Sequence, residues 1–428
     1  MQKSNPFALL PLAVFLLLYL GGSWYLGDFY SLPVFLIFML ALGVAFIQYP
    51  KIPLSNKIHA FAKGAGDDTL LSMILIFLLA GAFGAISKEI GAVDSVVKIA
   101  LNFIPGSFLI AGFFIIASII SISMGTSVGT IAVITPLAIG MQSYIGEAFS
   151  MLLAAIIGGA MLGDNLSFIS DTTIAATRTQ GISMKEKFVV NVRIVTLPAC
   201  VTLILYFFHP VHVSDFSLVA FDSMDFIKIT PYLVVFILAI LGVNVLISLG
   251  IAILLALTIG WSMKIMGGLQ ALEVLQNGLA SMFELSMLCI IIAGTVGIIR
   301  ENGGIQYLLS MISNRIQSSK QAEIGIAVVT GLVNACVANN TIAILIVGPM
   351  AKEISKTNNV LPKRTASIMD TISCFVQGCL PYGAQILTVL SLIGYNLSAF
   401  EIIQFLYYPF LIGLGTLLFI LFFPPKIS

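Results

Sequence analysis

The densest cluster of polar side chains inside an apolar stretch lies at residues 163–173, which read Gly-Asp-Asn-Leu-Ser-Phe-Ile-Ser-Asp-Thr-Thr. Asp164, Ser167 and Asp171 are spaced i, i+3 and i+7, which would place them on one face of a helix. An ionisable group in a membrane-length apolar stretch is costly, so these residues are candidates for function. The other hydroxyl groups of the cluster belong to Ser170, Thr172 and Thr173.

A related cluster occurs in the second half of the chain. Asp370, Ser373 and Gln377 have the same spacing, and Pro381-Tyr382-Gly383 follows them and should break a helix. If the motif that begins at Asp164 recurs from Asp370, then Gln377 is the counterpart of Asp171. The extra carboxylate therefore predicts that the main cation and proton site lies in the first half.

Carboxylate, hydroxyl and amide oxygens are the ligands that a hard cation such as sodium prefers. Asp164, Asp171 and Asp370 are the expected carboxylate ligands of a transiently bound sodium ion, with unwound backbone carbonyls completing its shell. Because burial disfavours a charged carboxylate, a proton and a sodium ion would compete for one position. Such competition is sufficient for antiport if access alternates between the two sides, and no cofactor is required.

Two other apolar stretches are interrupted by small polar residues. One, at 105–142, is broken near 125–129, and the other, at 321–355, contains a polar tip at 339–341. Ser, Thr and Asn are good N-caps, so each break is expected to start a half-helix whose positive end points at the middle of the membrane. A positive helix end also favours anions, whereas preceding backbone carbonyls favour a cation, and both alternatives stay open. The candidate residues at these tips are Ser127, Asn339, Asn340 and Thr341.

The composition predicts an all-α polytopic membrane protein. Hydrophobic residues make up 59% of the 428 residues, charged residues only 9%, and the mean hydropathy is +1.08. A soluble domain has about 25% charged residues. Apolar segments near the length that a helix needs to cross a bilayer recur along the chain. The predicted partners are the lipid bilayer and small ions, and a net charge of +1 gives no indication of nucleic acid.

The chain contains two similar halves. Ala80-Gly81-x-x-Gly84-x-Ile86 returns as Ala293-Gly294-x-x-Gly297-x-Ile299, and Thr130-Ile131-Ala132 returns in the same order as Thr341-Ile342-Ala343. We predict a membrane repeat at 1–209, an external linker at 210–227 and a second repeat at 228–428. Each repeat would have five crossing helices, a re-entrant hairpin and a helix broken at the midplane. Five is odd, so the repeats would have inverted topology, as in many secondary transporters.

The basic residues agree with this topology. With the N-terminus inside, 16 of the 20 Lys and Arg residues, including Lys3, Lys187 and Lys426, fall on the cytoplasmic side. This asymmetry is typical of cytoplasmic loops. Both termini are therefore expected in the cytoplasm. The four external residues would be Lys88, Lys98, Lys228 and Lys264.

The segment 163–173 resembles the signature of the NhaC-type sodium/proton antiporter family, usually seen as G-D-K/N-x-S-x-x-S-D-T-T. The resemblance covers nearly the whole chain, including Asp370-x-x-Ser373 and the tip at 339–341. It implies inverted repeats, paired re-entrant hairpins, often a homodimeric scaffold, and a bacterial inner membrane. Many relatives have Lys where this chain has Asn165, which would remove an ion-pair partner of Asp164.

The first hypothesis for function is therefore sodium/proton antiport, and no enzymatic activity is expected. The alternative is sodium- or proton-coupled transport of a small organic acid or amino acid, because the family includes exchangers of organic acids. We find no Arg or Lys deep in an apolar span that could pair with a substrate carboxylate, which argues against this alternative. A purely structural role for the three acids would require a buried partner such as Arg178 or Arg193.

Overall fold

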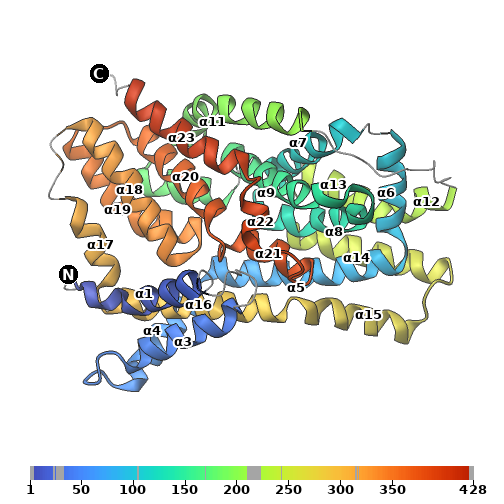
Figure 1. The fold of residues 1–428 in the computed structure, drawn as a ribbon, viewed down its shortest axis with the longest axis horizontal. Helices are drawn as coiled ribbons and strands as arrows, with labels where there is room; N and C mark the ends of the chain where they lie inside the picture. The colour runs from blue at the N-terminus through green and yellow to red at the C-terminus, as the bar shows by residue number, and fades with distance from the viewer. Residues whose placement is uncertain are drawn as a thin grey trace.

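The structure, a computed structural model, describes residues 4–22, 25, 33–103, 106–168, 170–209, 223–241, 243–313, 316 and 318–423. Every regular element in these ranges is a helix, as predicted (Figure 1). Most of the linker predicted at 210–227, and Lys3 and Lys426 near the termini, lie outside the described residues.

The first half of the chain begins with a 3₁₀ turn at Pro6–Leu9 and a π-helical turn at Leu17–Gly21 that follows α1. A further 3₁₀ turn at Gly146–Ala148 precedes α9. The helices of this first half are α1 (Leu10–Leu16), α3 (Val34–Ile47), α4 (Leu54–Ala65), α5 (Asp68–Glu89), α6 (Ala92–Phe103), α7 (Gly106–Met124), α8 (Ser127–Ile145), α9 (Phe149–Leu166), α10 (Asp171–Gln180) and α11 (Met184–Phe207).

The second half contains a similar series of helices. They are α12 (Ser223–Lys228), α13 (Thr230–Ile240), α14 (Val245–Ser262), α15 (Gly268–Ser281), α16 (Phe283–Glu301), α17 (Gly304–Ser313), α18 (Ser319–Val337), α19 (Asn340–Thr357), α20 (Pro362–Cys379), α21 (Ala384–Leu392), α22 (Ala399–Ile403) and α23 (Tyr407–Phe422).

Among the described residues, 7 helical segments are long and apolar enough to cross a membrane, and shorter apolar helices accompany them. The chain is therefore a multi-span helical membrane protein, which confirms the predicted class. Many large apolar side chains on its surface, such as Ile47, Leu241 and Trp261, are exposed, as expected of a surface that faces lipid. The five crossings predicted for each half, and their inverted orientation, stay predictions.

Helix boundaries recur in the two halves at one constant shift in residue number. The hairpin helices α7 and α18 both have 19 residues and begin at Gly106 and Ser319. The shift from Gly106 to Ser319, here called the repeat offset, also relates the starts of α8 and α19, the ends of α9 and α20, and the starts of α10 and α21. The second half therefore repeats the hairpin and the broken helix of the first.

The two hairpins lie toward opposite ends of the long axis of the molecule. In Figure 1, α7 and α8 occupy the right-hand part and α18 and α19 the left-hand part. Each hairpin packs against the broken helix of its own half, since α7 and α8 contact α9, and α18 and α19 contact α20. This arrangement brings the two hairpin tips together near the middle of the molecule.

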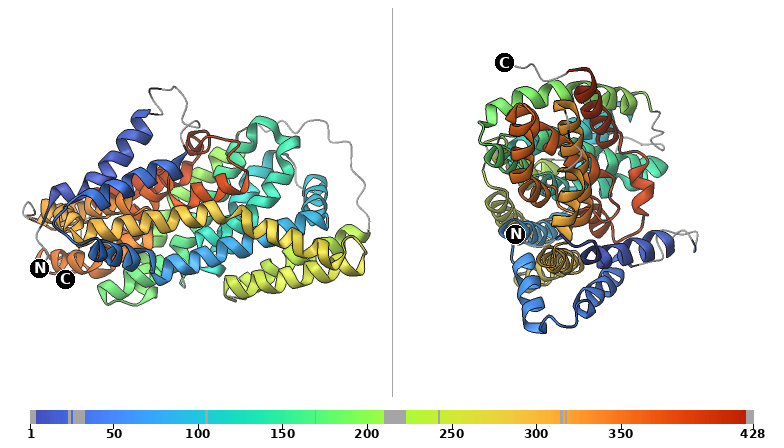
Figure 2. Two further views of the ribbon diagram at one scale, coloured as in Figure 1. Left: turned by 90° about the horizontal axis from the view of Figure 1, so that it is seen from below. Right: turned by 90° about the vertical axis from the view of Figure 1, so that its left-hand side faces the viewer.

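The repeated glycine motif marks where helices of the two halves cross. α15 packs along α5, α4 packs along α16, and these helices run side by side along the long axis (Figure 2). A Cβ atom on Gly81 would collide with the carbonyl oxygen of Gly278, and one on Gly64 with that of Ala293. Only glycine allows so close an approach of two helix backbones.

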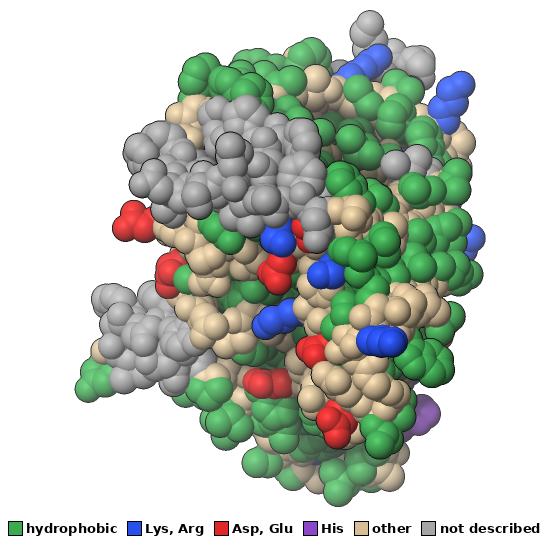
Figure 3. Space-filling view, turned by 90° about the vertical axis from the view of Figure 1, so that its right-hand side faces the viewer, with side chains coloured by type: hydrophobic (Ala, Val, Ile, Leu, Met, Phe, Trp, Pro, Cys, Tyr) green, Lys and Arg blue, Asp and Glu red, His purple; other side chains and the backbone are tan. Residues whose placement is uncertain are grey.

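The end of the molecule near α6 and α12 has a mixed surface. Figure 3 shows acidic and basic side chains over the middle of this end, with apolar side chains along its margins. Lys98 and Asp225 form an ion pair here, with 3.5 Å between Nζ and Oδ1. Charged groups at an end and apolar groups along the sides are typical of a membrane protein viewed from the aqueous phase.

Candidate functional site

A cavity of about 400 Å³ lies where the two hairpin tips meet the two helix breaks. The wall also includes part of α5 and the start of α14. No Lys, Arg or His is found among the described residues that line it, whereas two carboxylates are. The predicted site residues in the wall are Ser127, Asp164, Asp171, Thr172, Asn339, Asn340, Thr341 and Gln377.

Asp164 lies near the end of α9, and only 6% of the residue is exposed. Thr172 Oγ1 donates a hydrogen bond to its Oδ2 over 3.4 Å, and Ser170 Oγ lies 3.1 Å from Thr172 Oγ1. No cationic side chain among the described residues forms an ion pair with Asp164. A buried carboxylate without a resident counter-charge requires a bound cation or a proton.

Ser167 and Ser170 lie outside helices α9 and α10, so Asp164, Ser167 and Asp171 do not share the face of one continuous helix, contrary to what their spacing predicted. Ser167 has an extended backbone directly after α9, and α10 begins at Asp171, with Ser170 as its N-cap. Asp164 and Asp171 therefore reach one cavity from the end of one helix and the start of the next. Ser170 Oγ accepts a hydrogen bond from the Thr173 backbone N–H over 3.1 Å.

Three backbone carbonyls at this break accept hydrogen bonds from side chains. The carbonyl of Asp164 accepts from Ser170 Oγ at 3.1 Å, and that of Ser167 accepts from Thr173 Oγ1 at 2.9 Å. The carbonyl of Asn165 accepts from Asn191 Nδ2 at 2.8 Å. Side chains thus satisfy carbonyls that the end of α9 would leave unpaired. A carbonyl oxygen has two lone pairs, so the predicted role of unwound carbonyls as cation ligands stays a prediction.

Asp171 is the first residue of α10 and is exposed at the cavity wall. A carboxylate in the first turn of a helix is favoured by the free backbone N–H groups and by the helix dipole. Neither Arg178 nor Arg193, the structural partners considered from the sequence, forms an ion pair with it. Both are exposed.

Each hairpin tip begins a helix at the cavity, as predicted, although Thr126 rather than Ser127 caps α8. Thr126 Oγ1 accepts from the Gly129 N–H at 3.3 Å, and Asn339 Oδ1 accepts from the Ile342 N–H at 3.0 Å. The residue before each cap has a left-handed backbone, with φ of 70° at Gly125 and 50° at Ala338. Because Thr126 caps α8, the Ser127 hydroxyl is not used for capping and accepts a hydrogen bond from Gln385 Nε2 at 3.2 Å.

The cavity wall is built from pairs of positions that the repeat offset relates. Thr126 pairs with Asn339, and Asp164 pairs with Gln377, which is likewise the third residue from the end of its helix. The pairing of Asp164 with Asp370 and of Asp171 with Gln377, taken from the sequence, is therefore wrong. The remaining pairs in the wall are Ser127 with Asn340, Val128 with Thr341, Asp171 with Ala384 and Thr172 with Gln385.

The amide side chains of the second half hold the break near the tip of the second hairpin. Gln377 Nε2 donates to the carbonyl of Ala338 at 2.8 Å. The amide oxygens of Gln377 and Gln385 accept no hydrogen bond from the described residues, although both side chains are buried beside the cavity. Free acceptor oxygens of this kind suit a cation, a water molecule or a protonated ligand.

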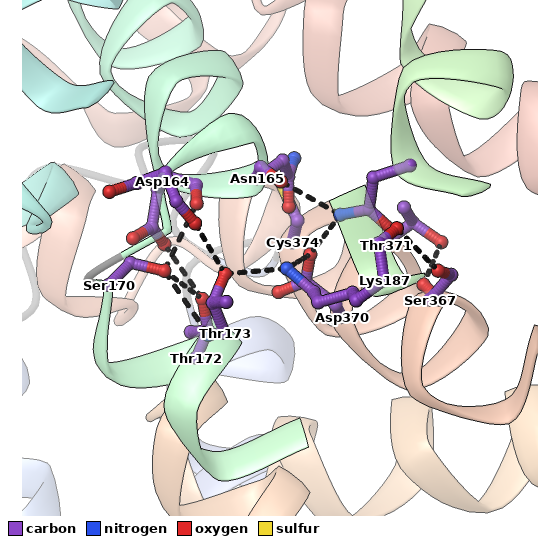
Figure 4. A network of polar contacts seen from close by, with 12 residues as sticks. Asp164, Asn165, Ser170, Thr172, Thr173, Lys187, Ser367, Asp370, Thr371 and Cys374 are labelled. Atoms are coloured by element: carbon purple, nitrogen blue, oxygen red, sulfur yellow. Dashed lines mark hydrogen bonds and ion pairs between the residues drawn. The ribbon is translucent and has the colours of Figure 1, made fainter. Parts of the chain in front are cut away.

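Asp370 does not line the cavity and has a resident partner (Figure 4). The Lys187 Nζ lies 2.8 Å from Asp370 Oδ2, and each side chain is 1% exposed. Lys187 was predicted on the cytoplasmic side, and nothing in the sequence indicated that its side chain would be buried against Asp370 near the start of α11. Asn191 Nδ2 also donates to Asp370 Oδ2, at 2.7 Å.

The other predicted hydroxyl residues bond to the backbone or to the Lys187 network. Ser167 Oγ donates to the carbonyl of Ile122 at 2.7 Å, and Ser373 Oγ donates to that of Asp370 at 2.9 Å. Thr173 Oγ1 accepts from Lys187 Nζ at 2.6 Å. Ser167, Ser170 and Thr173 thus form hydrogen bonds at the α9–α10 break, whereas Ser373 bonds to the backbone of its own helix. None of these four residues lines the cavity.

Asn165, which stands where many relatives have Lys, makes hydrogen bonds of its own. The Asn165 side chain bonds to Tyr408 Oη at 3.0 Å and to Cys374 Sγ at 3.1 Å, not to Asp164. A positive charge is still present nearby, because Lys187 supplies it on α11. Lys187 pairs with Asp370 and forms no ion pair with Asp164, so the predicted loss of an ion-pair partner of Asp164 stays a prediction.

Several residues of the site were missed from the sequence. Gln385 follows the predicted helix break by two positions, and Asn244 caps α14 by accepting from the Leu246 N–H at 2.9 Å. A polar residue two positions after a helix-breaking Pro-Tyr-Gly is a signal that could have indicated Gln385. Lys187 and Asn191 are spaced i, i+4 in an apolar helix, which places both on one face.

Comparison with known proteins shows what this chain is similar to. The family model described as the Na+/H+ antiporter family matches residues 5–211 and 182–423. The Na(+)/H(+) antiporter NhaC of Bacillus subtilis (strain 168) is 25% identical over 83% of this chain and 84% of its own length. The NhaC antiporter of Alkalihalophilus pseudofirmus is 22% identical over 90% of this chain and 88% of its own length.

Two further similarities are partial or distant. The malate-2H(+)/Na(+)-lactate antiporter of Bacillus subtilis (strain 168) is 31% identical over 39% of this chain and 35% of its own length. The crystal structure of the YdaH transporter of Alcanivorax borkumensis covers 85% of this chain and 86% of its own, with a TM-score of 0.45 and 13% identity. This structural likeness is too distant to support a functional argument.

Proposed function

Because this chain belongs to the Na+/H+ antiporter family, we propose that it exchanges sodium ions for protons across the membrane, with Asp164 and Asp171 as the groups that take up either ion. The observation that carries this proposal is the state of Asp164. It is buried beside a cavity and has no ion-pair partner among the described residues.

The exchange follows from charge balance at this cavity. A deprotonated Asp164, buried and without an ion-pair partner among the described residues, is stabilised by a sodium ion, and an Asp164 that has taken up a proton no longer attracts one. The two ions therefore exclude each other from the same oxygen atoms. A protein that binds them in turn while facing opposite sides of the membrane performs antiport.

Neutral oxygens around the two carboxylates support the binding of a dehydrated cation. Thr172 lies beside Asp164, and Ser127, Asn339, Asn340, Thr341 and Gln377 face the same cavity from the other elements. Hydroxyl and amide oxygens are suitable ligands for a hard monovalent ion. We assign to these residues the completion of the sodium shell, with water molecules filling the rest of the cavity.

Alternating access would come from the two-fold organisation of the chain. The constant repeat offset, and the hairpins placed toward opposite ends, support two repeats of inverted topology. In this scheme the hairpins and broken helices move against a scaffold formed by the first helices of each repeat. We further propose a bacterial inner membrane, cytoplasmic termini and assembly as a homodimer.

A second candidate function is exchange of a small organic acid coupled to sodium or protons. The similarity to the malate/lactate antiporter supports it, as do the helices α8, α10, α14, α19 and α21, all of which begin at the cavity. Helix N-termini favour anions. The absence of Lys, Arg and His from the described residues of the wall opposes an organic anion, so antiport of sodium and protons remains the first proposal.

Proteoliposomes that contain the purified protein and a pH-sensitive dye test the proposal. Sodium should dissipate an imposed proton gradient, choline should not, and Asp164→Asn and Asp171→Asn should each abolish the sodium response. Full activity in both variants would exclude this mechanism. A response to malate, lactate or another small carboxylate that sodium alone does not produce would favour the second candidate.

A further inference from the structure

The Lys187 ammonium is enclosed by oxygen atoms in the interior of the protein. Its Nζ lies 2.6 Å from Thr173 Oγ1 and 2.8 Å from Asp370 Oδ2. Figure 4 shows this group between the α9–α10 break and α20. A carboxylate and a hydroxyl around one positive charge form the kind of oxygen shell that a bound sodium ion would have.

The ion pair has no direct opening to the cavity that contains Asp164 and Asp171. Neither Lys187 nor Asp370 lines that cavity, and both are almost completely buried. Displacing the ammonium by a sodium ion would leave a tethered positive charge without a partner in the protein interior. That cost is high, because breaking a buried pair leaves an uncompensated charge.

The pair reaches the ion-binding break through two short chains of hydrogen bonds. Thr173 Oγ1 accepts from Lys187 and donates to the carbonyl of Ser167 at 2.9 Å. Asn191 Nδ2 is shared by Asp370 Oδ2, at 2.7 Å, and the carbonyl of Asn165, at 2.8 Å. Two carbonyls that flank the end of α9 are thus held by groups that converge on Asp370 of the second half.

We propose that Lys187 and Asp370 are positioning residues: a resident ion pair holds the break that presents Asp164, and Asp370 carries neither sodium nor protons. This inference rests on the proposed antiport function and refines it. All exchange then takes place at the carboxylates of the first half. The second half contributes Asp370, which pairs with Lys187 of the first half behind the site, and the amide groups of Gln377 and Gln385 in the cavity wall.

The decisive variant is the charge-balanced double substitution Lys187→Gln with Asp370→Asn, compared with wild type and Asp164→Asn in proteoliposomes. It removes both charges, keeps polar side chains of similar shape, and leaves no unpaired ion. We expect exchange to persist, with the KM for sodium raised about three- to tenfold, as the loss of one or two orienting hydrogen bonds would cause, and with Vmax within about twofold.

Other outcomes are equally informative. A folded double variant without exchange, like Asp164→Asn, would show that Asp370 carries an ion and would overturn the proposal. An unchanged KM together with a lowered Tm would show a merely structural pair and would also overturn it. Absence of any sodium response in the wild-type protein would instead refute the proposed function.

The thermal stability of the single variants provides a readout that does not depend on transport. Lys187→Gln leaves a buried, charged Asp370 without its ion-pair partner. Asp370→Asn leaves a buried, charged Lys187 without its partner. We expect each single variant to have a lower Tm than the double variant, since the two sites are energetically coupled. Additive losses, with the double variant least stable, would contradict a resident ion pair.

Discussion

Gln377 occupies, in the second half of the chain, the position that Asp164 occupies in the first. Each is the third residue from the end of the helix that precedes a break, the repeat offset relates the two, and both line the cavity. An amide therefore replaces a carboxylate at related positions. Asp171 is likewise related to Ala384, which carries no charge. Both carboxylates in the described wall, Asp164 and Asp171, therefore come from the first half of the chain.

Substitution of Gln377 by Glu should make exchange depend more steeply on pH. Gln377 Nε2 donates to the carbonyl of Ala338 in the second hairpin tip, and only a protonated Glu could make the same bond. We expect Gln377→Glu to approach wild-type rates at acidic pH and to lose activity as the pH rises. Gln377→Met, which cannot donate at any pH, serves as the control and should be impaired throughout. Parallel pH profiles for Gln377→Glu and wild type would contradict this role.

Sodium should stabilise the purified protein more at alkaline than at acidic pH. Binding to the folded state alone contributes about 2.7 kcal/mol when the ligand concentration is 100 times its Kd. In the proposed mechanism protons occupy Asp164 and Asp171 at acidic pH, so less sodium should bind and the increase in Tm should be smaller. The comparison uses sodium chloride against choline chloride at equal ionic strength. Asp164→Asn should show no sodium-specific increase, and an increase equal to that of wild type would count against the site.

The two hairpin turns predict opposite effects of matched substitutions. Ala338 has a left-handed backbone with φ of 50°, whereas its counterpart Gly125 has φ of 70°. The left-handed conformation costs a residue with a Cβ atom about 1–2 kcal/mol of conformational free energy, and it does not cost glycine this amount. We expect Ala338→Gly to be stabilising and Gly125→Ala to be destabilising by amounts of that order. Thermal unfolding in detergent measures both, and a loss of stability in Ala338→Gly would refute the argument.

The helix crossings predict a contrast between two glycines. Gly81 in α5 touches the backbone of α15 at Gly278, whereas Gly112 in α7 has no neighbour within 4 Å of the place that a Cβ atom would take. Gly81→Ala should cost about 1–3 kcal/mol through overpacking. Gly112→Ala should be neutral or stabilising by up to about 1 kcal/mol, since alanine is the better helix former. Equal Tm values for the two variants would show that the crossing tolerates a methyl group.

The sequence alone determined the class of the protein and the location of its breaks. Apolar segments with few charges require a lipid environment, and glycine, proline and N-capping residues end one helix and start the next wherever they occur. The helix breaks after Leu166 and Cys379, and the turns at Gly125 and Ala338, lie within or next to the segments where these residues predicted interruptions. The polar cluster at 163–173 and the family resemblance needed no coordinates either.

Only the tertiary structure decided which of these groups share one cavity. Asp370 matches Asp164 in local sequence, but it lies two helical turns before Gln377 on one helix, which is about 10 Å along the axis. That distance removes it from the cavity and places it beside Lys187, a residue that the sequence places on the cytoplasmic side without indicating a buried partner. Local motifs report residue types and spacing, whereas the partner of a buried charge depends on how helices distant in sequence pack together.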